Sequence, residues 1–150
     1  MIIRPLHGAD VERLTRVWRR AVEATHGFLS PADIDTIEAD IGPYLSTETG
    51  LWTLEVDGEP KGFMGLSGPE IQSLFIDPDL HGRGLGRAMV NHAVAQGASW
   101  LQVNEGNPKA IGFYEALGFL TTGRRETDDA GRPFPLLIMD RNGPATESGG

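Results

Sequence analysis

The stretch LFIDPDLHGRGLGR, residues 74–87, joins an apolar segment to a turn with glycine at every second position, and a helical pattern follows. The apolar end, Leu74 to Ile76, predicts a buried strand, and residues 85–93 repeat apolar side chains at helical spacing. Glycines let neighbouring backbone N–H groups turn toward one point, and the N-terminus of a helix adds partial positive charge there. The stretch therefore predicts an anion site between a strand and a helix.

Three phosphate-binding interpretations compete for this loop. A Walker loop requires Gly-Lys followed by Ser or Thr, and the chain contains no Gly-Lys pair. A dinucleotide fingerprint requires a glycine where Arg87 stands, and it follows the first strand of its fold rather than a central one. The third interpretation is coenzyme A, which also carries a pyrophosphate. A plain glycine-rich turn remains an equal alternative on these residues alone.

A second stretch, NPKAIGFYEALGF at residues 107–119, follows the next predicted strand. Together the two stretches resemble the GNAT superfamily of acetyl-coenzyme A dependent N-acetyltransferases. The first motif of that superfamily runs Gln/Arg-x-x-Gly-x-Gly/Ala after an apolar strand. The second motif, Asn-x-x-Ala-x-x-x-Tyr-x-x-x-Gly-Phe, is matched by Asn107, Ala110, Tyr114, Gly118 and Phe119. Residues 24–30 and 133–137 are similar to a bacterial subgroup typified by YjaB.

The resemblance implies a binding site for acetyl-coenzyme A. Backbone N–H groups near Phe75 and Ile76 would stabilise the thioester oxygen, and residues 74–76 would pair with the pantetheine arm like an additional strand. Asn107 would contact the cofactor, although it also suits the N-cap of a helix. The expected cofactor-binding residues are Leu74, Phe75, Ile76, His81, Gly82, Arg83, Gly84, Leu85, Gly86, Arg87, Asn107 and Tyr114.

His81 departs from the motif, which has Gln or Arg at this position. An imidazole can still donate a hydrogen bond to a phosphate, and Arg83 and Arg87 supply positive charge nearby. Because imidazole changes its charge near neutral pH, we expect cofactor binding to be weaker or more sensitive to pH than with Gln or Arg.

Aminolysis of a thioester needs a neutral amine, donors to the carbonyl oxygen and a proton for the leaving thiolate. The resemblance makes Tyr114 the acid, whereas periodicity alone would make it a core aromatic beside Phe113. Glu70 lies eleven residues before His81, which resembles the spacing of the base in histone-acetylating members of the superfamily. Glu70 is therefore the predicted base, directly or through a water. The alternative is a solvated residue that begins a strand.

Other candidates border the acceptor side of the predicted site. In ribosomal-protein acetylating members the base lies on the next strand, and the residue at that position here is Gln102, which cannot accept a proton. His26 and Phe28 belong to the loop between the first two predicted helices, which usually borders the acceptor. We expect both to contribute to substrate binding, although a single histidine in a loop is more often incidental.

The order of predicted elements fits the same family: a strand, two helices, three strands, a helix, a strand, a helix and two strands. Hairpins and crossovers together imply an α+β fold, with about seven strands in one mixed, mostly antiparallel sheet flanked by about four helices. Asp10 and Ser30 are predicted N-caps of the first two helices, and Gly27 is a predicted stop. We expect residues 1–141 to form one domain and residues 142–150 a disordered tail.

Composition narrows the classes of partner. The net charge of −8 argues against non-specific binding to nucleic acid and mildly favours a cationic amine as substrate. The chain has no cysteine, which excludes disulfides, thiolate metal sites and cysteine nucleophiles, and its histidines show no metal-ligand spacing. Neither a signal-peptide pattern nor an apolar run of membrane-spanning length is present. We expect a soluble, cytoplasmic monomer or homodimer without membrane or metal partners.

The sequence therefore predicts an N-acetyltransferase that moves acetyl from acetyl-coenzyme A to a primary amine by direct attack in a ternary complex. The subgroup resemblance favours a protein lysine as acceptor, and a polyamine, an amino acid or an antibiotic amine are alternatives. A hypothesis of another class is a non-catalytic acyl-coenzyme A sensor. Tyr114 favours the enzyme, because a sensor needs no proton donor at that position.

Overall fold

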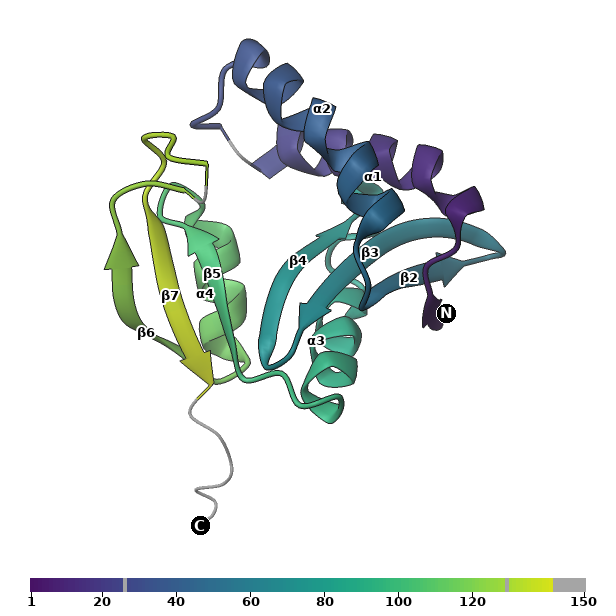
Figure 1. Cartoon of the computed structure of the whole chain (residues 1–150). Coiled ribbons are helices and arrows are strands. Elements are labelled where there is room, and N and C mark those ends of the chain that lie inside the picture. Colours follow the sequence, from purple (N-terminus) through teal and green to yellow (C-terminus); the bar gives the residue numbers. More distant parts are fainter. Residues whose placement is uncertain (26, 129, 142–150) are drawn as a thin grey trace.

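The computed structural model of the chain describes residues 1–25, 27–128 and 130–141. Its described residues form a seven-stranded sheet in the order β1-β2-β3-β4-β5-β7-β6, with four α-helices and two short 3-10 helices (Figure 1). The strands are β1 (Ile2–Pro5), β2 (Leu51–Val56), β3 (Glu59–Ser67), β4 (Glu70–Ile76), β5 (Trp100–Asn104), β6 (Phe119–Arg125) and β7 (Leu136–Arg141). The helices are η1 (Gly8–Asp10), α1 (Val11–Thr25), α2 (Pro31–Thr47), η2 (Pro78–Leu80), α3 (Leu85–Ala95) and α4 (Pro108–Ala116). The predicted order of strands and α-helices is confirmed.

The sheet is antiparallel except between its two central strands, β4 and β5, which are parallel. Among the described residues these two strands pair at Glu70 with Trp100 and at Ile71 with Leu101, and not beyond. The rest of β4 diverges from β5, so that the sheet opens along its middle (Figure 1). The divergence leaves one edge of β4 without a neighbouring strand next to the glycine-rich loop.

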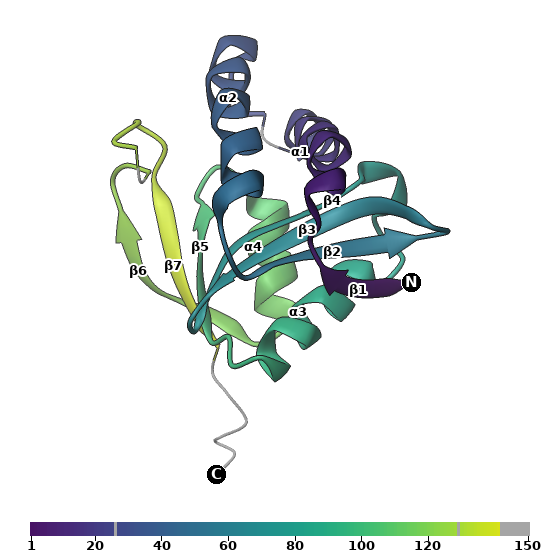
Figure 2. The ribbon, with the colours of Figure 1, turned by 45° about the vertical axis from the view of Figure 1, so that its right-hand side comes forward.

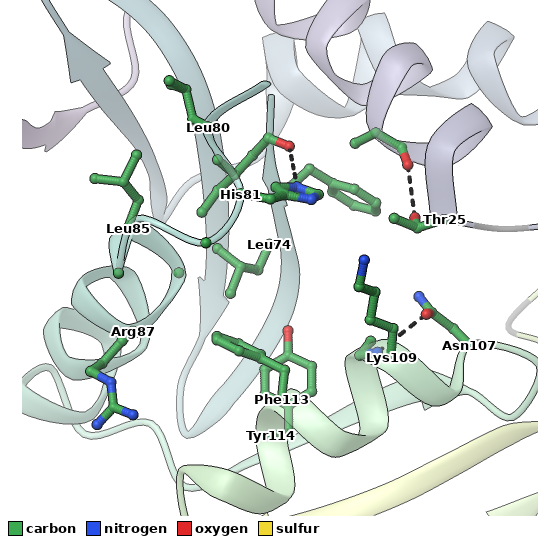
Figure 3. Close-up of a pocket in the computed structure, with 17 residues that line it drawn as sticks. Thr25, Leu74, Leu80, His81, Leu85, Arg87, Asn107, Lys109, Phe113 and Tyr114 are labelled. Carbon is green, nitrogen blue, oxygen red and sulfur yellow. Dashed lines mark hydrogen bonds between the residues drawn. The ribbon is translucent and has the colours of Figure 1, made fainter. Parts of the chain in front are cut away.

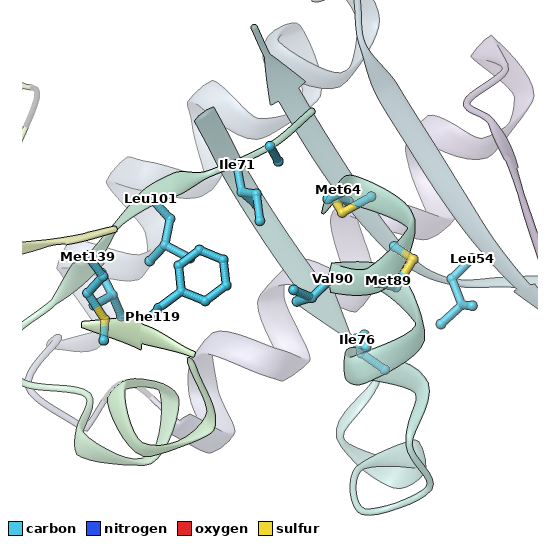
Figure 4. Close-up of a cluster of buried hydrophobic side chains, with 12 residues drawn as sticks. Leu54, Met64, Ile71, Ile76, Met89, Val90, Leu101, Phe119 and Met139 are labelled. Atoms are coloured by element: carbon cyan, nitrogen blue, oxygen red, sulfur yellow. The ribbon is translucent and has the colours of Figure 1, made fainter. Parts of the chain in front are cut away.

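Helices cover both faces of the sheet (Figure 2). On one face α1 and α2 pack through Leu14, Trp18 and Ile34 against Phe63 of β3. On the other face α3 packs against β2 to β5, and this core extends to β6 and β7 (Figure 4). Its buried members include Leu54, Met64, Ile71, Ile76, Met89, Val90, Leu101, Phe119 and Met139. Burial of apolar side chains in the two layers fixes β4 and β5 at the centre of the molecule.

The start of α2 follows the predicted chemistry. The Ser30 hydroxyl accepts from the Asp33 N–H at 3.1 Å, and the Asp33 carboxylate accepts from the Ser30 N–H at 3.0 Å. This reciprocal pair is a capping box, with Pro31 in the first turn. The helix continues past the predicted end at Leu45 to Thr47.

The prediction that Asp10 caps the first long helix is wrong. Asp10 lies in η1 and is 5% exposed, and its carboxylate accepts two hydrogen bonds from the Arg4 guanidinium, at 2.8 and 3.0 Å. It also accepts from the His7 N–H at 2.9 Å and from the Thr53 hydroxyl at 3.1 Å. The Arg4 guanidinium is the main cause that lowers the pKa of Asp10 to about 2. Asp10 therefore joins β1, η1 and β2 rather than starting α1.

Candidate functional site

Two pockets meet where β4 and β5 diverge. The first, of about 470 Å³, lies between β4, the loop at residues 81–87 and α4. The second, of about 770 Å³, lies between β4, β5, α2 and residues 128–136. Their linings share five residues: Leu74, Phe75, Asn107, Ala110 and Tyr114. A ligand in each pocket would therefore meet its neighbour at this junction.

The glycines of the loop have two different structural roles. Gly82 and Gly84 have φ angles of 82° and 78°, in the left-handed region that favours glycine. At Gly86 a Cβ atom would lie 2.9 Å from the ring of Phe113, so the absence of a side chain allows α3 and α4 to approach. Gly84 is also the N-cap of α3, which begins at Leu85. The loop therefore presents the N-terminus of an eleven-residue helix to the first pocket, as an anion site requires.

Most predicted cofactor residues line this first pocket. Of the loop residues, Arg83 lies outside the lining, whereas His81, Gly82, Gly84, Leu85, Gly86 and Arg87 belong to it. The lining also includes Lys109, Phe113 and Thr25, which the sequence analysis did not assign (Figure 3). Lys109 falls on a variable position of the second motif, and its charge was the signal that could have indicated it.

His81 makes a hydrogen bond within the chain, and its contact with a phosphate stays a prediction. Its Nε2 lies 3.1 Å from the carbonyl oxygen of Ile76 (Figure 3). A carbonyl oxygen only accepts, so Nε2 carries the hydrogen and donates. The imidazole therefore ties the loop to the end of β4.

The open edge of β4 presents the backbone of alternate residues. The Asp77 N–H donates to the Lys61 carbonyl at 2.8 Å, on the β3 side, and the Phe75 carbonyl faces Gly62 of β3. Because backbone groups alternate between the two edges of a strand, those of Leu74 and Ile76 face the gap. The Ile76 carbonyl accepts the hydrogen bond from His81, which lies on the gap side of β4, so this bond agrees with the assignment. Of the two N–H groups expected to stabilise the thioester oxygen, that of Ile76 faces the gap and that of Phe75 faces β3.

Tyr114 lies at the junction of the pockets. Its ring makes edge contacts with Phe113 and Phe119, at centroid distances of 5.0 and 5.8 Å. Figure 3 shows its hydroxyl directed toward the pocket and Leu74. Desolvation raises the pKa of the phenol above its ordinary value, so Tyr114 keeps its proton at neutral pH. The role of Tyr114 as a proton donor stays a prediction.

Asn107 is the N-cap of α4, as predicted. Its Oδ1 accepts from the Ala110 N–H at 3.2 Å, and the residue is 6% exposed. Since Oδ1 is used by the cap, the amide NH₂ is the end of the side chain that is left for a ligand in either pocket. Contact with the cofactor stays a prediction.

Glu70 is the first residue of β4 and lines the second pocket. The Gln102 side chain donates from Nε2 to Glu70 Oε2 at 3.3 Å, and the Arg125 guanidinium donates to Gln102 Oε1 at 2.8 Å. The carboxylate is therefore half-buried and tied to β5, which differs from a freely solvated residue. Neither its partner Gln102 nor Arg125, which bonds Gln102, was assigned a role from the sequence.

The other walls of the second pocket combine aliphatic and aromatic side chains. Phe28 lines it, as predicted for an acceptor-side residue, and contacts Phe134 at a ring distance of 5.8 Å. The Tyr44 hydroxyl and Ser73 Oγ are 2.9 Å apart, an approach that a side chain at Gly65 would block. His26 lies outside the described residues. Tyr44 was missed, because nothing near it in the sequence resembles a motif.

Comparison with known proteins agrees with this geometry. Residues 13–119 match the model of the acetyltransferase (GNAT) family. The chain belongs to the GNAT acetyltransferase family. Members of this family use acetyl-coenzyme A, and the chain is an N-acetyltransferase, as the two sequence motifs predict. The predicted fold is also confirmed.

Individual relatives are similar over nearly the whole chain. The peptidyl-lysine N-acetyltransferase YjaB of Salmonella typhimurium is 46% identical over 140 residues, which cover 91% of this chain and 95% of the relative. The solution structure of apo-form YjaB from Escherichia coli has a TM-score of 0.88 at 41% identity, covering 95% of this chain and 99% of the other. These matches confirm the predicted YjaB-like subgroup. PaiA N-acetyltransferase from Thermoplasma acidophilum, in complex with coenzyme A, shares the fold, with a TM-score of 0.66 at 20% identity and coverage of 93% and 97%.

In residues 1–25, 27–128 and 130–141, no three His, Asp or Glu side chains are grouped so that they could hold a metal ion. Within the same ranges, no helix has both the length and the apolar character needed to cross a membrane.

Proposed function

We propose that the chain acetylates the ε-amino group of lysine side chains in proteins, with acetyl-coenzyme A in the first pocket and the lysine in the second. The observation that carries the proposal is the junction of the two pockets at Leu74 and Tyr114. A lysine has a long apolar stem and a charged head, and the apolar side chains and carboxylates of the second pocket suit both. The similarity to a peptidyl-lysine N-acetyltransferase supports this acceptor.

The residues of the first pocket fit coenzyme A. The N-terminus of α3 with Gly82 and Gly84 suits the pyrophosphate, and Arg87 and Lys109 add positive charge to the lining. The backbone groups of Leu74 and the N–H of Ile76 face the gap beside β4, and they suit the amides of the pantetheine arm. Acetyl-coenzyme A supplies the activated acetyl group, and the chain's own residues do the remaining work.

The reaction needs one new bond, one broken bond and two proton movements. The amine nitrogen bonds to the thioester carbon while the carbon–sulfur bond breaks. Glu70 accepts the proton of the amine, directly or through a water, and Tyr114 donates a proton to the departing thiolate. The N–H of Ile76 stabilises the charge on the carbonyl oxygen. No covalent enzyme intermediate is required, because both ligands meet at the junction.

Several alternatives make different demands on the second pocket. Glu48, Glu70 and Asp128 lie in its walls, and Arg132 is paired with Asp128 at 3.4 Å, so the pocket favours cationic ligands. A polyamine, an amino acid or an antibiotic amine would share that preference. A non-catalytic sensor has no use for the second pocket or for Tyr114. The metal-free reaction, a cytoplasmic monomer or homodimer, and the lack of nucleic-acid and membrane partners stay predictions of the sequence.

A panel of acceptors tests the proposal. Coenzyme A release would be followed with a lysine-containing peptide, the same peptide with acetylated lysine, spermidine, free lysine and an aminoglycoside. We expect the highest kcat/KM with the lysine peptide and no release with its acetylated form. A higher kcat/KM for a small amine would identify a small-molecule acceptor. Binding of acetyl-coenzyme A without release by any amine would identify a sensor.

A further inference from the structure

Three side chains form a hydrogen-bonded row, and two of them, Glu70 and Gln102, line the second pocket. Arg125 of β6 donates to Gln102 of β5 at 2.8 Å, and Gln102 donates to Glu70 of β4 at 3.3 Å. The row runs across the sheet from β6 to the point where β4 and β5 part. It ends on the carboxylate that we assign as the base.

The direction of this row is fixed by chemistry. A guanidinium has donors only, so the Gln102 oxygen must face Arg125 and its NH₂ must face Glu70. A carboxylate accepts only, so it matches the NH₂ end. Reversing the amide would set donor against donor and acceptor against acceptor. Arg125 therefore decides how Gln102 is oriented toward Glu70.

We propose that Gln102, oriented by Arg125, is a positioning residue that holds Glu70 for proton transfer. The bond occupies Oε2 and leaves Oε1 to accept the proton of the amine or of an intervening water. Tyr44 of α2 and Glu48, the C-cap of that helix, line the same pocket as Glu70. The inference rests on the proposed reaction, since it gives Gln102 a role only if Glu70 is the base.

The test is the pH dependence of kcat with a saturating lysine peptide. Gln102→Leu removes the donor, so we expect kcat to fall about tenfold, less than the loss of a base would cost, and the acid limb of the profile to move to higher pH. The KM for acetyl-coenzyme A should stay unchanged. Gln102→Glu keeps a partner for Arg125 but places a second carboxylate beside Glu70, and should move the acid limb further. Arg125→Met should also lower kcat and move the acid limb to higher pH, by less than Gln102→Leu does.

A matched control and a double variant separate positioning from structure. Arg124 is the neighbour of Arg125 on β6 but pairs with Glu105 on the other face, at 2.8 Å, so Arg124→Met should leave the profile unchanged. In a Glu70→Gln background, Gln102→Leu should cause no further loss, because it acts through Glu70. The proposal would be overturned if Gln102→Leu lowered kcat as much in the Glu70→Gln background as in the unaltered chain. It would also be overturned if the acid limb of the pH profile stayed in place in both Gln102 variants.

The possible failures are distinguishable. If Glu70→Gln retains full kcat, acetyl transfer stands but Glu70 is not the base, and the positioning role falls with it. If the unaltered chain releases no coenzyme A with any amine, the transfer reaction itself is refuted. Thermal unfolding of each variant shows whether its fold is intact.

Discussion

The two pockets are built from different kinds of structure. The first has three glycines, a helix N-terminus and the open edge of β4 in its wall, all within residues 74–87, and α4 closes it. The second is walled by side chains from α1, α2, β4, β5 and residues 128–136, which lie far apart in the sequence. A pocket made of local backbone can hold one invariant ligand, whereas a pocket of distant side chains can change its acceptor without changing the fold. The following variants test that separation, and they are ordered from the largest expected effect to the smallest.

At the junction of the pockets, the hydroxyl of Tyr114 should affect the rate of the reaction rather than the binding of either ligand. Tyr114→Phe removes the hydroxyl and keeps the ring contacts with Phe113 and Phe119. We expect kcat to fall about 100-fold, since a general acid contributes on that order, with both KM values nearly unchanged. Steady-state release of coenzyme A measures this effect. An unchanged kcat would remove Tyr114 from the mechanism.

Outside both pockets, Asp10 should affect stability alone. Its pKa is lowered to about 2 in the folded chain from 3.8, so its charged form stabilises the fold. This contribution, about 2 kcal/mol, is complete above about pH 4 and is lost as the pH falls toward 2. Asp10→Asn should lower the free energy of unfolding at pH 7 and weaken its dependence on pH in that window, as measured by urea unfolding.

An exposed acid serves as the control for that variant. Glu12 on α1 has a side chain that is 86% exposed and pairs with Arg16 at 3.4 Å. Glu12→Gln should change neither stability nor its pH dependence, because exposed ion pairs contribute little. If Asp10→Asn behaved like Glu12→Gln, the network around Asp10 would have no stabilising role.

In the first pocket, Gly84→Ala should act on the cofactor only. A side chain at a φ of 78° costs about 1–2 kcal/mol, so we expect the KM for acetyl-coenzyme A to rise about tenfold. The KM for the amine should stay unchanged. Gly112→Ala on α4, where a Cβ meets nothing within 4 Å, is the matched control. An equal effect of both variants would contradict the role of the loop.

In the second pocket, Tyr44→Phe should act on the acceptor only. It removes the hydroxyl that bonds Ser73 at 2.9 Å and leaves the ring in the wall. We expect the KM for the amine to rise about threefold, in line with the loss of one neutral hydrogen bond. The KM for acetyl-coenzyme A should not change, and a rise in it would show that the pockets are not separable.

The difference between a pocket built from local segments and one built from distant side chains also explains which features the sequence could predict. The loop at 81–87 and the motif at 107–119 are local, so the sequence could predict that Asn107 caps α4 and that the two motifs lie in one place, where both line the first pocket. The bond between His81 and Ile76 was not predictable, because a motif gives position and not the direction of a ring. The same limit applies to Arg83, which lies outside the lining.

Contacts of the acceptor side depend on strand register. Gln102 is 32 residues from Glu70 and 23 from Arg125, and they meet only because β7 pairs with both β5 and β6. Tyr44 reaches Ser73 across 29 residues because Gly65 leaves room between them. Neither the strand register nor the room beside Gly65 can be read from composition or periodicity. Glu70 was predicted as the base, but its partners could not be.

The most direct test of the central claim is a ligand that spans both pockets. Coenzyme A joined through an acetyl bridge to the ε-nitrogen of a peptide lysine should occupy both pockets through the junction at Tyr114. Calorimetry should show it binding at least about 100-fold more tightly than coenzyme A, and it should compete with both substrates. An affinity equal to that of coenzyme A, without competition against the peptide, would contradict the account.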